Sequence, residues 1–357
     1  MTATTAMGTA RATLGAAVEN LHPAYFAMVM ATGIVSIASH LLGYRAIGVG
    51  LFWLNIGFCV ILCALTLLRI VLFPRRVIDD LSSHGRSVGF FTTVAGTCVL
   101  GSQFLIVGAM PRVATVLWFL GITLWALLTY AIFTSLTVKS VKPSLADGIH
   151  GGWLVAVVAA QSVAVLGAQL ATHFAPYERQ VLFFCLAMWL GGGMLYIWII
   201  SLIFYRYTFF TLSPADLAPP YWINMGAVAI STLAGTMLIA AASHSTLLAS
   251  LLPFLKGLTL LFWATATWWI PMLVILGIWR HVYRRFPLRY DPLYWGAVFP
   301  LGMYTACTVR LAHVLDDSAF LMTIPRAFIY VAYAAWLGTF IGLLRHLFEA
   351  ARGIDRR

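Results

Sequence analysis

The stretch IGVGLFWLNIGFCVILCALTLLRIVLF, residues 47–73, contains a single charged side chain, Arg69. A helix needs about 20 mostly apolar residues to cross the hydrocarbon core of a bilayer, so this stretch is long enough for one crossing. The whole chain of 357 residues has the same character, because 62% of its residues are hydrophobic and 9% are charged. Ordinary globular proteins carry about 25% charged residues. The composition therefore excludes a disordered chain, a secreted disulfide scaffold and a nucleic-acid-binding domain, and it predicts a polytopic membrane protein.

Apolar stretches of this kind recur along the chain. They are long and lack the apolar/polar alternation of a membrane β-barrel, so they predict helices. We expect an all-α membrane protein with one transmembrane domain at residues 22–346, between tails at 1–21 and 347–357. Its ten transmembrane helices are predicted at residues 24–43, 47–73, 88–110, 113–138, 153–172, 181–205, 222–243, 254–279, 295–315 and 322–344.

Lysine and arginine are distributed unequally between the two sides of these spans. With the N-terminus inside, the inner segments hold 16 of them and the outer segments hold 5, while Arg310 lies inside a span. Positive side chains collect in the short cytoplasmic loops of membrane proteins. The net charge of +11 is thus explained without a nucleic-acid partner. We expect both termini to be cytoplasmic and the protein to lie in the plasma membrane, which is the inner membrane in a bacterium.

The loops alternate in length, which makes the helical hairpin the unit of the chain. Outer loops are short and inner connections are longer and charged, so five hairpins follow one another. The first helix of each hairpin carries small residues near its middle, and the second is bulkier. Small residues let helices approach closely or leave room beside them. We expect the first helices to form an inner ring around an axis; the alternative is that their small residues serve helix packing only. The candidate axis-lining residues are Gly33, Ser36, Gly96, Gly101, Gly235, Gly302, Met303 and Ala306.

The ninth span contains the one charged residue well inside a membrane helix, Arg310. Eleven residues of α-helix make about three full turns, so Phe299 and Arg310 share a face, with Met303 and Ala306 between them. Pro300 tends to kink the helix and could push the Phe299 ring towards the axis. An aromatic ring at a narrow constriction forms a hydrophobic gate. The alternative is that Phe299 packs in the core and Arg310 snorkels to the outer headgroups.

Other ionisable residues near the membrane are few. No Asp, Glu or Lys lies in the middle of a span, which argues against a cation pump and against carboxylate-based proton coupling. Arg310 is expected to attract anions on the outer side. His40 and His313 lie at outer helix ends, where imidazoles could gain charge below about pH 6.5 and also attract anions; histidines at headgroup depth can also be without a role. The sequence lacks phosphate-binding, dinucleotide and zinc-protease motifs. We therefore expect no cofactor, no metal and no enzyme activity.

Two motifs carry a resemblance to a known family. The first span, HPAYFAMVMATGIVS at residues 22–36, resembles the opening helix of the tellurite-resistance/dicarboxylate transporter family. That family is related to the plant slow anion channels and includes yeast malate permeases and fungal sulfite exporters. The Thr-Gly-Ile-Val-Ser run is most similar to the malate and sulfite branch. Phe299-Pro300 is similar to the part of the family's ninth helix that bears a pore-occluding phenylalanine. The resemblance covers roughly residues 22–346.

The resemblance implies more than the residues themselves do. It implies a pseudo-five-fold bundle in which the odd-numbered helices line a central pore, a homotrimer with one pore in each subunit, and Phe299 as the plug of that pore. The implied function is an anion channel or transporter that moves small anions or C4-dicarboxylates across the plasma membrane. A proton-coupled dicarboxylate (malate) or sulfite carrier is the alternative within the class. A membrane-embedded enzyme is the alternative from another class. It would need a nucleophile, a metal cluster or a carboxylate pair at membrane depth, and the sequence shows none of these.

Overall fold

The computed structural model describes residues 15–351, and all regular structure in this range is helical. This confirms the predicted all-α membrane protein. The parts of the predicted tails at 1–14 and 352–357 lie outside the described residues. The ten long helices are α2 (Ala27–Leu41), α3 (Arg45–Leu72), α5 (Phe91–Ile106), α6 (Pro111–Val138), α8 (Val155–Leu170), α9 (Glu178–Phe209), α10 (Ile223–Ala240), α12 (Leu252–Ile278), α13 (Trp295–Val314) and α14 (Thr323–Ala351). Short helices α4 (Pro74–Leu81), α7 (Leu145–Gly148) and α11 (Thr246–Ser250) lie in the connections.

Nine of the described helices are long and apolar enough to cross a membrane by length and composition. The tenth predicted span, α13, is a helix of 20 residues that falls outside this group. Pro300, Gly302 and Arg310 lower its hydropathy, while almost all of its residues are buried among its neighbours. A helix that is shielded from lipid on every side does not need a continuous apolar surface, so α13 completes the bundle with a more polar sequence.

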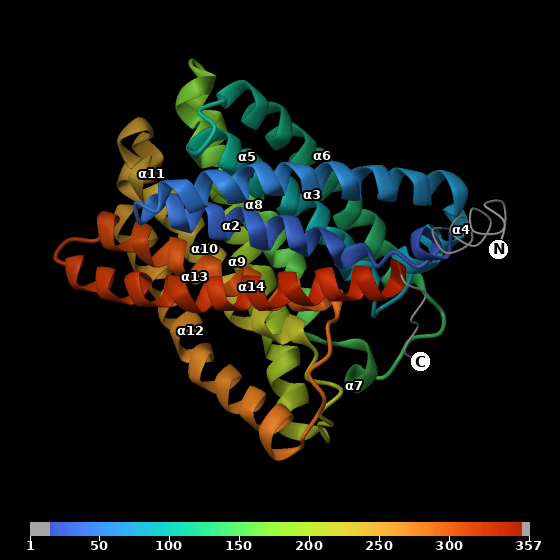
Figure 1. Cartoon of the computed structure of the whole chain (residues 1–357). Helices are drawn as coiled ribbons and strands as arrows, with labels where there is room; N and C mark the ends of the chain where they lie inside the picture. The colour runs from blue at the N-terminus through green and yellow to red at the C-terminus, as the bar shows by residue number, and fades with distance from the viewer. Residues whose placement is uncertain (1–14, 352–357) are drawn as a thin grey trace.

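The long helices form two layers. Neighbouring contacts run α2–α5–α8–α10–α13 and return from α13 to α2, which closes an inner ring of five helices. Each inner helix also packs against the outer helix of its own hairpin, α3, α6, α9, α12 or α14. Figure 1 shows the last hairpin, α13 and α14, beside α2 of the first. In the most apolar part of four inner helices 72–89% of the residues are buried, against 17–44% in the five outer ones. The odd spans therefore lie inside and the even spans outside.

At least one side-chain hydrogen bond links each outer helix to the inner helix of the next hairpin. A buried N–H without a partner is costly in an apolar environment, so these bonds fix the order of the hairpins. The last of them joins α14 to α2 and closes the ring. The donors and acceptors are Asn55 Nδ2 to Gln103 Oε1 (2.6 Å), Trp118 Nε1 to the Val163 carbonyl (3.0 Å), Trp189 Nε1 to the Ser231 carbonyl (2.8 Å), Trp263 Nε1 to Thr308 Oγ1 (3.0 Å) and Trp336 Nε1 to Thr32 Oγ1 (3.0 Å).

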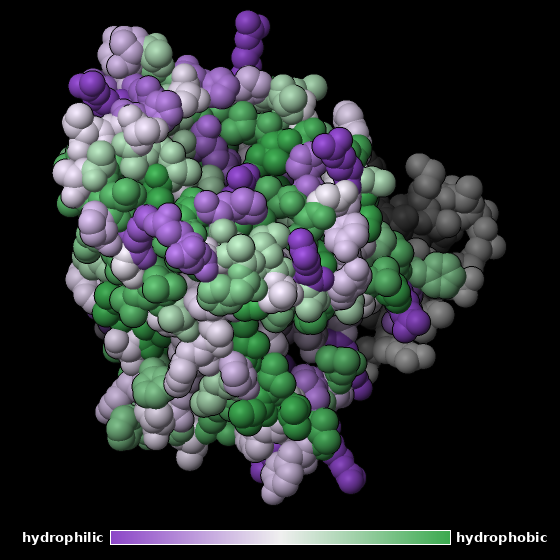
Figure 2. All heavy atoms as spheres, turned by 90° about the vertical axis from the view of Figure 1, so that its left-hand side faces the viewer, coloured by the Kyte–Doolittle hydropathy of each residue, from purple (hydrophilic) through white to green (hydrophobic). Residues whose placement is uncertain are grey.

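All five inner helices run in the same direction, because each is the first helix of its hairpin. Each begins with a 3₁₀ turn at the end of the bundle that also carries α4 and α7 (Figure 1). Figure 2 looks onto the opposite end, where polar side chains are scattered among apolar ones. The N-terminal turns therefore gather at one end of the ring. They are η1 (Pro23–Phe26), η2 (Ser87–Phe90), η3 (Gly151–Leu154), η5 (Pro219–Trp222) and η8 (Pro292–Tyr294).

Candidate functional site

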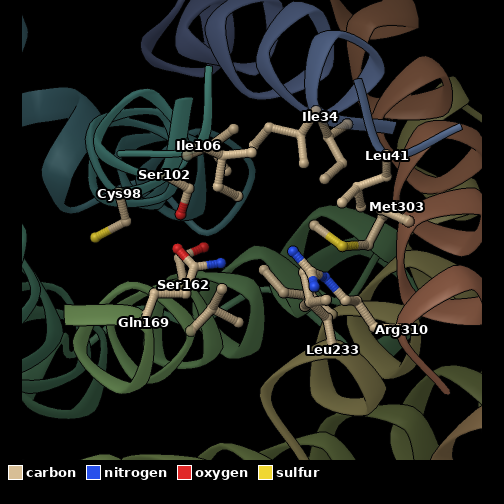
Figure 3. A pocket seen from close by; sticks show the side chains of 15 residues that line it. Ile34, Leu41, Cys98, Ser102, Ile106, Ser162, Gln169, Leu233, Met303 and Arg310 are labelled. Carbon is tan, nitrogen blue, oxygen red and sulfur yellow. The ribbon is translucent and has the colours of Figure 1, made fainter. Parts of the chain in front are cut away.

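A cavity lies inside the ring, in the half of the bundle away from the N-terminal turns. All five inner helices contribute to its wall. Its volume, as the space open to the centre of a water molecule, is about 20 Å³, which is room for about one or two waters. Figure 3 shows side chains from several helices pointing into it. The lining residues include one from each inner helix at the same depth, namely Ile34, Val99, Ser162, Ile230 and Met303.

A second cavity of about 70 Å³ lies at the opposite end of the ring, among the N-terminal turns. It too is lined by all five inner helices or their first turns. The lining residues include one from each inner helix, namely Ala27, Thr92, Val155, Ile223 and Gly296. We call it the inner cavity, and the first one the outer cavity.

The two cavities are related by the same spacing on every helix. A residue that lines the inner cavity is followed seven positions later by a residue that lines the outer cavity. Seven residues are about two turns, or about 10.5 Å along the helix. The five helices are thus in register around one axis. The pairs are Ala27 and Ile34, Thr92 and Val99, Val155 and Ser162, Ile223 and Ile230, and Gly296 and Met303.

Phe299 occupies the level between the two cavities. It lies three residues after Gly296 and four before Met303, so it is on the same face of α13 as both. Its side chain is fully buried, and it lines neither cavity. The other inner helices carry smaller or flexible residues at the corresponding positions, which are Met30, Ala95, Val158 and Gly226.

Pro300 lies inside α13, which is helical on both sides of it. The pyrrolidine ring faces α10, because a Cβ placed on Gly226 would lie 2.7 Å from Pro300 Cγ. Glycine at position 226 therefore lets α10 approach α13 closely beside Phe299.

The small residues predicted to line the axis lie in two kinds of place. Met303 and Ala306 line the outer cavity together with Arg310. The others lie in helix contacts: a Cβ on Gly101 would lie 2.5 Å from Leu166 Cδ2, and one on Gly302 2.9 Å from Ile34 Cγ2. For these positions the packing alternative describes the structure, because each small side chain faces a neighbouring helix. They are Gly33, Ser36, Gly96, Gly101, Gly235 and Gly302.

The polar groups of the outer cavity come from three helices. Arg310 on α13, Gln169 and Ser102 line it together with Ser162. In the part of the chain that the structure describes, the guanidinium of Arg310 and the hydroxyl of Ser102 have no hydrogen-bond or ion-pair partner. Gln169 Nε2 donates only to Met237 Sδ, at 3.9 Å. Ser162 is one of the small mid-helix residues that predicted the inner ring. Sequence reasoning missed Gln169 and Ser102, although aligning the inner helices at their first turns would have placed Gln169 level with Arg310.

The outer histidines do not join Arg310 in the cavity. His313 is exposed and its Nδ1 lies 2.6 Å from the Val309 carbonyl. His40 is half-buried at the end of α2 and does not line the outer cavity. Another outer histidine, His244, contacts Glu178 with 2.9 Å between Nδ1 and Oε1. Of the three residues predicted to attract anions, Arg310 lines the outer cavity, whereas His40 and His313 do not.

Two other histidines, His22 and His150, line the inner cavity. In each, Nδ1 accepts a hydrogen bond from the backbone N–H two residues later, that of Ala24 or Gly152, at 3.1 Å. Burial lowers the pKa of His22 to about 4, and the charge of Arg86 acts in the same direction. Burial lowers the pKa of His150 to about 4 as well. Both rings are therefore neutral caps of the first turns. Within residues 15–351 no three His, Cys, Asp or Glu side chains gather as a metal site.

Comparison with known proteins agrees with this architecture. The voltage-dependent anion channel family matches residues 20–344. An uncharacterized membrane protein of Mycobacterium tuberculosis is 40% identical over 153 residues, which cover 43% of this chain and 77% of the relative. Two uncharacterized transporters of Methanocaldococcus jannaschii are similar over more of the chain. One is 28% identical, and the match covers 81% of this chain and 83% of the relative. The other is 25% identical, and the match covers 93% of this chain and 96% of the relative.

Proposed function

Because the chain belongs to the voltage-dependent anion channel family, we propose that it passes small anions across the membrane along the axis of its inner ring. The observation that carries this proposal is the pair of cavities, both lined by all five inner helices and separated by two turns on each of them. Such a matched pair is expected for a path through the bundle and has no role in packing alone.

The side chain of Phe299 is the proposed gate of this path. It is fully buried between the cavities, and the equivalent positions on the other helices are Met30, Ala95, Val158 and Gly226. A benzyl ring at this level blocks a passage that the smaller side chains would leave open. A hydrophobic constriction of this kind holds back hydrated ions until the ring moves.

Charge along the path favours anions. The positive ends of five helix dipoles point at the inner cavity, because all inner helices begin there. Arg310 supplies a formal positive charge at the outer cavity, and neither cavity has an acidic residue in its wall. The path would therefore favour anions with a single half-buried cation in its wall, Arg310, and weak binding suits rapid passage.

The gate is tested by replacing Phe299 with alanine. Phe299→Ala is expected to raise the anion conductance of the purified protein in planar bilayers by about tenfold or more, since the ring no longer fills the constriction. Phe91→Ala is the matched control. Phe91 is also fully buried in an inner helix, but its ring packs against that of Phe133 in α6, with 5.9 Å between the ring centroids. Equal conductance of Phe299→Ala and the unsubstituted protein, with both correctly folded, would contradict the gate.

We further infer three properties from the same resemblance: a location in the plasma membrane with both termini in the cytoplasm, assembly as a homotrimer, and one path in each subunit. Native mass spectrometry from detergent tests the trimer.

C4-dicarboxylates and sulfite remain candidate substrates, and a proton-coupled carrier is distinguished by uphill uptake driven by a pH gradient in liposomes. A channel shows no such uptake.

A further inference from the structure

We propose that Arg310, Gln169 and Ser102 form a selectivity site in the outer cavity for the flat, two-oxygen edge of a small monovalent oxyanion such as formate, bicarbonate or nitrate. This inference rests on the proposed function, because it names the class of anion that the path would select.

Arg310 and Gln169 lie at the same depth in the ring. Arg310 is seven residues after Met303 on α13, and Gln169 is seven residues after Ser162 on α8, where Met303 and Ser162 are equivalent positions of the outer cavity. Helix α10 separates α8 from α13 in the ring, so the two side chains approach the axis from different sides. Figure 3 shows the guanidinium and the amide pointing into the cavity toward one another. Ser102 lines the same cavity from α5.

These groups have hydrogen-bonding capacity that the protein itself does not use. Among the described residues, no acceptor is bound to the guanidinium of Arg310, which carries five N–H donors in a planar fork. Gln169 Nε2 has two donors, and its one contact is a thioether sulfur at 3.9 Å, a weak acceptor. Ser102 Oγ adds a donor without a partner, and only 4% of the surface of this residue is exposed. Unused donors at this depth favour a ligand or water that accepts them.

The geometry of the donors favours a planar anion. A guanidinium binds two oxygens of one carboxylate or similar group through parallel hydrogen bonds, which a spherical halide cannot accept in the same way. A third oxygen, or the far side of the bound pair, remains for the amide of Gln169 and the hydroxyl of Ser102. The site would therefore discriminate by shape as well as by charge.

The charge of the site favours a monovalent anion. Arg310 is the one formally charged residue in the wall of the outer cavity, and much of the wall is apolar, including Ile34, Leu41 and Leu233. A dianion would keep one negative charge uncompensated in these surroundings, which is costly. The volume of about 20 Å³ also fits an anion of a few heavy atoms better than a C4-dicarboxylate.

The test compares formate with chloride in planar bilayers, by reversal potentials with one anion on each side. Formate is more strongly hydrated than chloride, so a path that ranks anions by ease of dehydration favours chloride. The proposed site reverses this order, and we expect the full-length protein to favour formate by about fivefold or more, as one or two extra charge-assisted hydrogen bonds would give.

Two variants assign the preference to its residues. Arg310→Lys keeps the charge and removes the planar fork, so anion current should persist while the formate-to-chloride ratio falls about fivefold or more. Gln169→Leu should lower the ratio in the same direction. Leu100→Ile is the control, because Leu100 is buried in α5 and lines neither cavity, and its ratio should be unchanged. The ratio is measured on conducting molecules only, so poor folding of a variant does not imitate the effect.

The possible failures are distinct. Chloride favoured over formate by the unsubstituted protein, or an unchanged ratio in both Arg310→Lys and Gln169→Leu, overturns the selectivity site while the proposed anion path stands. Absence of any anion current, also in Phe299→Ala, overturns the proposed function, and the selectivity site with it.

Discussion

At the scale of single residues, position in the ring decides what a side chain does. Phe299 and Phe91 are both fully buried on inner helices, yet one lies between two axial cavities and the other faces the outer layer. The glycines show the same division of roles. Gly235 lies against α9 and α12, since a Cβ there would overlap Thr259 and lie 3.0 Å from Trp189, whereas Gly257 has open space beside it.

Gly235→Ala should therefore destabilise the protein by about 1–3 kcal/mol, the usual cost of forcing an extra carbon into a packed core. Gly257→Ala serves as the control for the change in helix propensity, and we expect it to leave stability unchanged or to raise it by up to about 1 kcal/mol. Thermal unfolding in detergent measures both variants. Equal melting temperatures for the two would show that α10 has room to move away from α12, against this interpretation.

At the scale of helices, hydrogen bonds at two depths hold the ring in register. Within the membrane, at least one side-chain donor of each outer helix bonds to the next inner helix. At the inner end, polar side chains cap the first turns of the inner helices, namely His22, His150 and Asp291. Near these turns, Asp80 of α4 joins the end of α3 to the segment that precedes α5, because it accepts from Arg69 and Arg86 at 2.7 and 2.6 Å.

Trp336→Phe should destabilise the protein by about 1 kcal/mol, because it removes the hydrogen bond to Thr32, one of those that join the last hairpin to the first. Trp53→Phe is the control, since Trp53 is 63% exposed on the outer surface. Melting temperatures in detergent compare the two. A loss of stability in Trp53→Phe as large as that in Trp336→Phe would argue against a specific ring-closing role.

The histidine caps predict a pH dependence of stability. The pKa values of His22 and His150 are lowered to about 4 in the folded protein, so the unfolded chain binds more protons between about pH 6.5 and 4. Stability from the two caps is complete above pH 6.5 and is lost as the pH falls through this window. We expect the melting temperature to fall by several degrees there. Asn retains the capping oxygen without titrating, so the fall should be smaller in His150→Asn. An unchanged fall in that variant would assign the effect to other groups.

Asp80 acts at lower pH. Burial opposes its ionisation, but the hydrogen bonds and charges of Arg86 and Arg69 outweigh burial and lower the pKa of the carboxyl. Its contribution to stability is therefore present above its usual pKa of about 4 and is lost only at more acidic pH. It does not contribute to the change between pH 6.5 and 4.

At the scale of the whole molecule, the axis is divided into two compartments. The two cavities have residues of all five hairpins in their walls, so neither exists until the ring is closed. The level of Phe299 lies between them, about one turn from each. The proposed function therefore predicts that each compartment is reached from one side of the membrane only.

Cysteine labelling in sealed vesicles checks this prediction. A small, charged, membrane-impermeant thiol reagent should react with Gln169→Cys from the outer face and with Thr92→Cys from the inner face, because these residues line the outer and inner cavities. The unsubstituted protein measures the background of the native cysteines. Adding Phe299→Ala should let each site react from both faces. Labelling of both sites from both faces without that substitution would contradict a closed constriction at Phe299.

Much of the fold could be predicted from the sequence, since membrane helices are determined by length and apolarity. The spans predicted at 47–73 and 295–315 correspond to α3 and α13, and boundary differences are small; the span predicted at 181–205 is longer, from Glu178 to Phe209. The division into odd inner and even outer helices followed from small residues. The same argument failed for individual positions such as Gly33 and Gly101, because a small residue is equally suited to a cavity wall and to a close helix contact.

The sequence by itself determined that the chain crosses the membrane as helices, because more than half of it is apolar and charge is confined almost entirely to the connections. It also identified Phe299 and Arg310 as two points on one face of a helix, from their spacing. Only the tertiary structure decided which residues of different helices share one depth. Gln169 meets Arg310 through the closure of a ring of five helices, and no local pattern in either helix contains the position of the other.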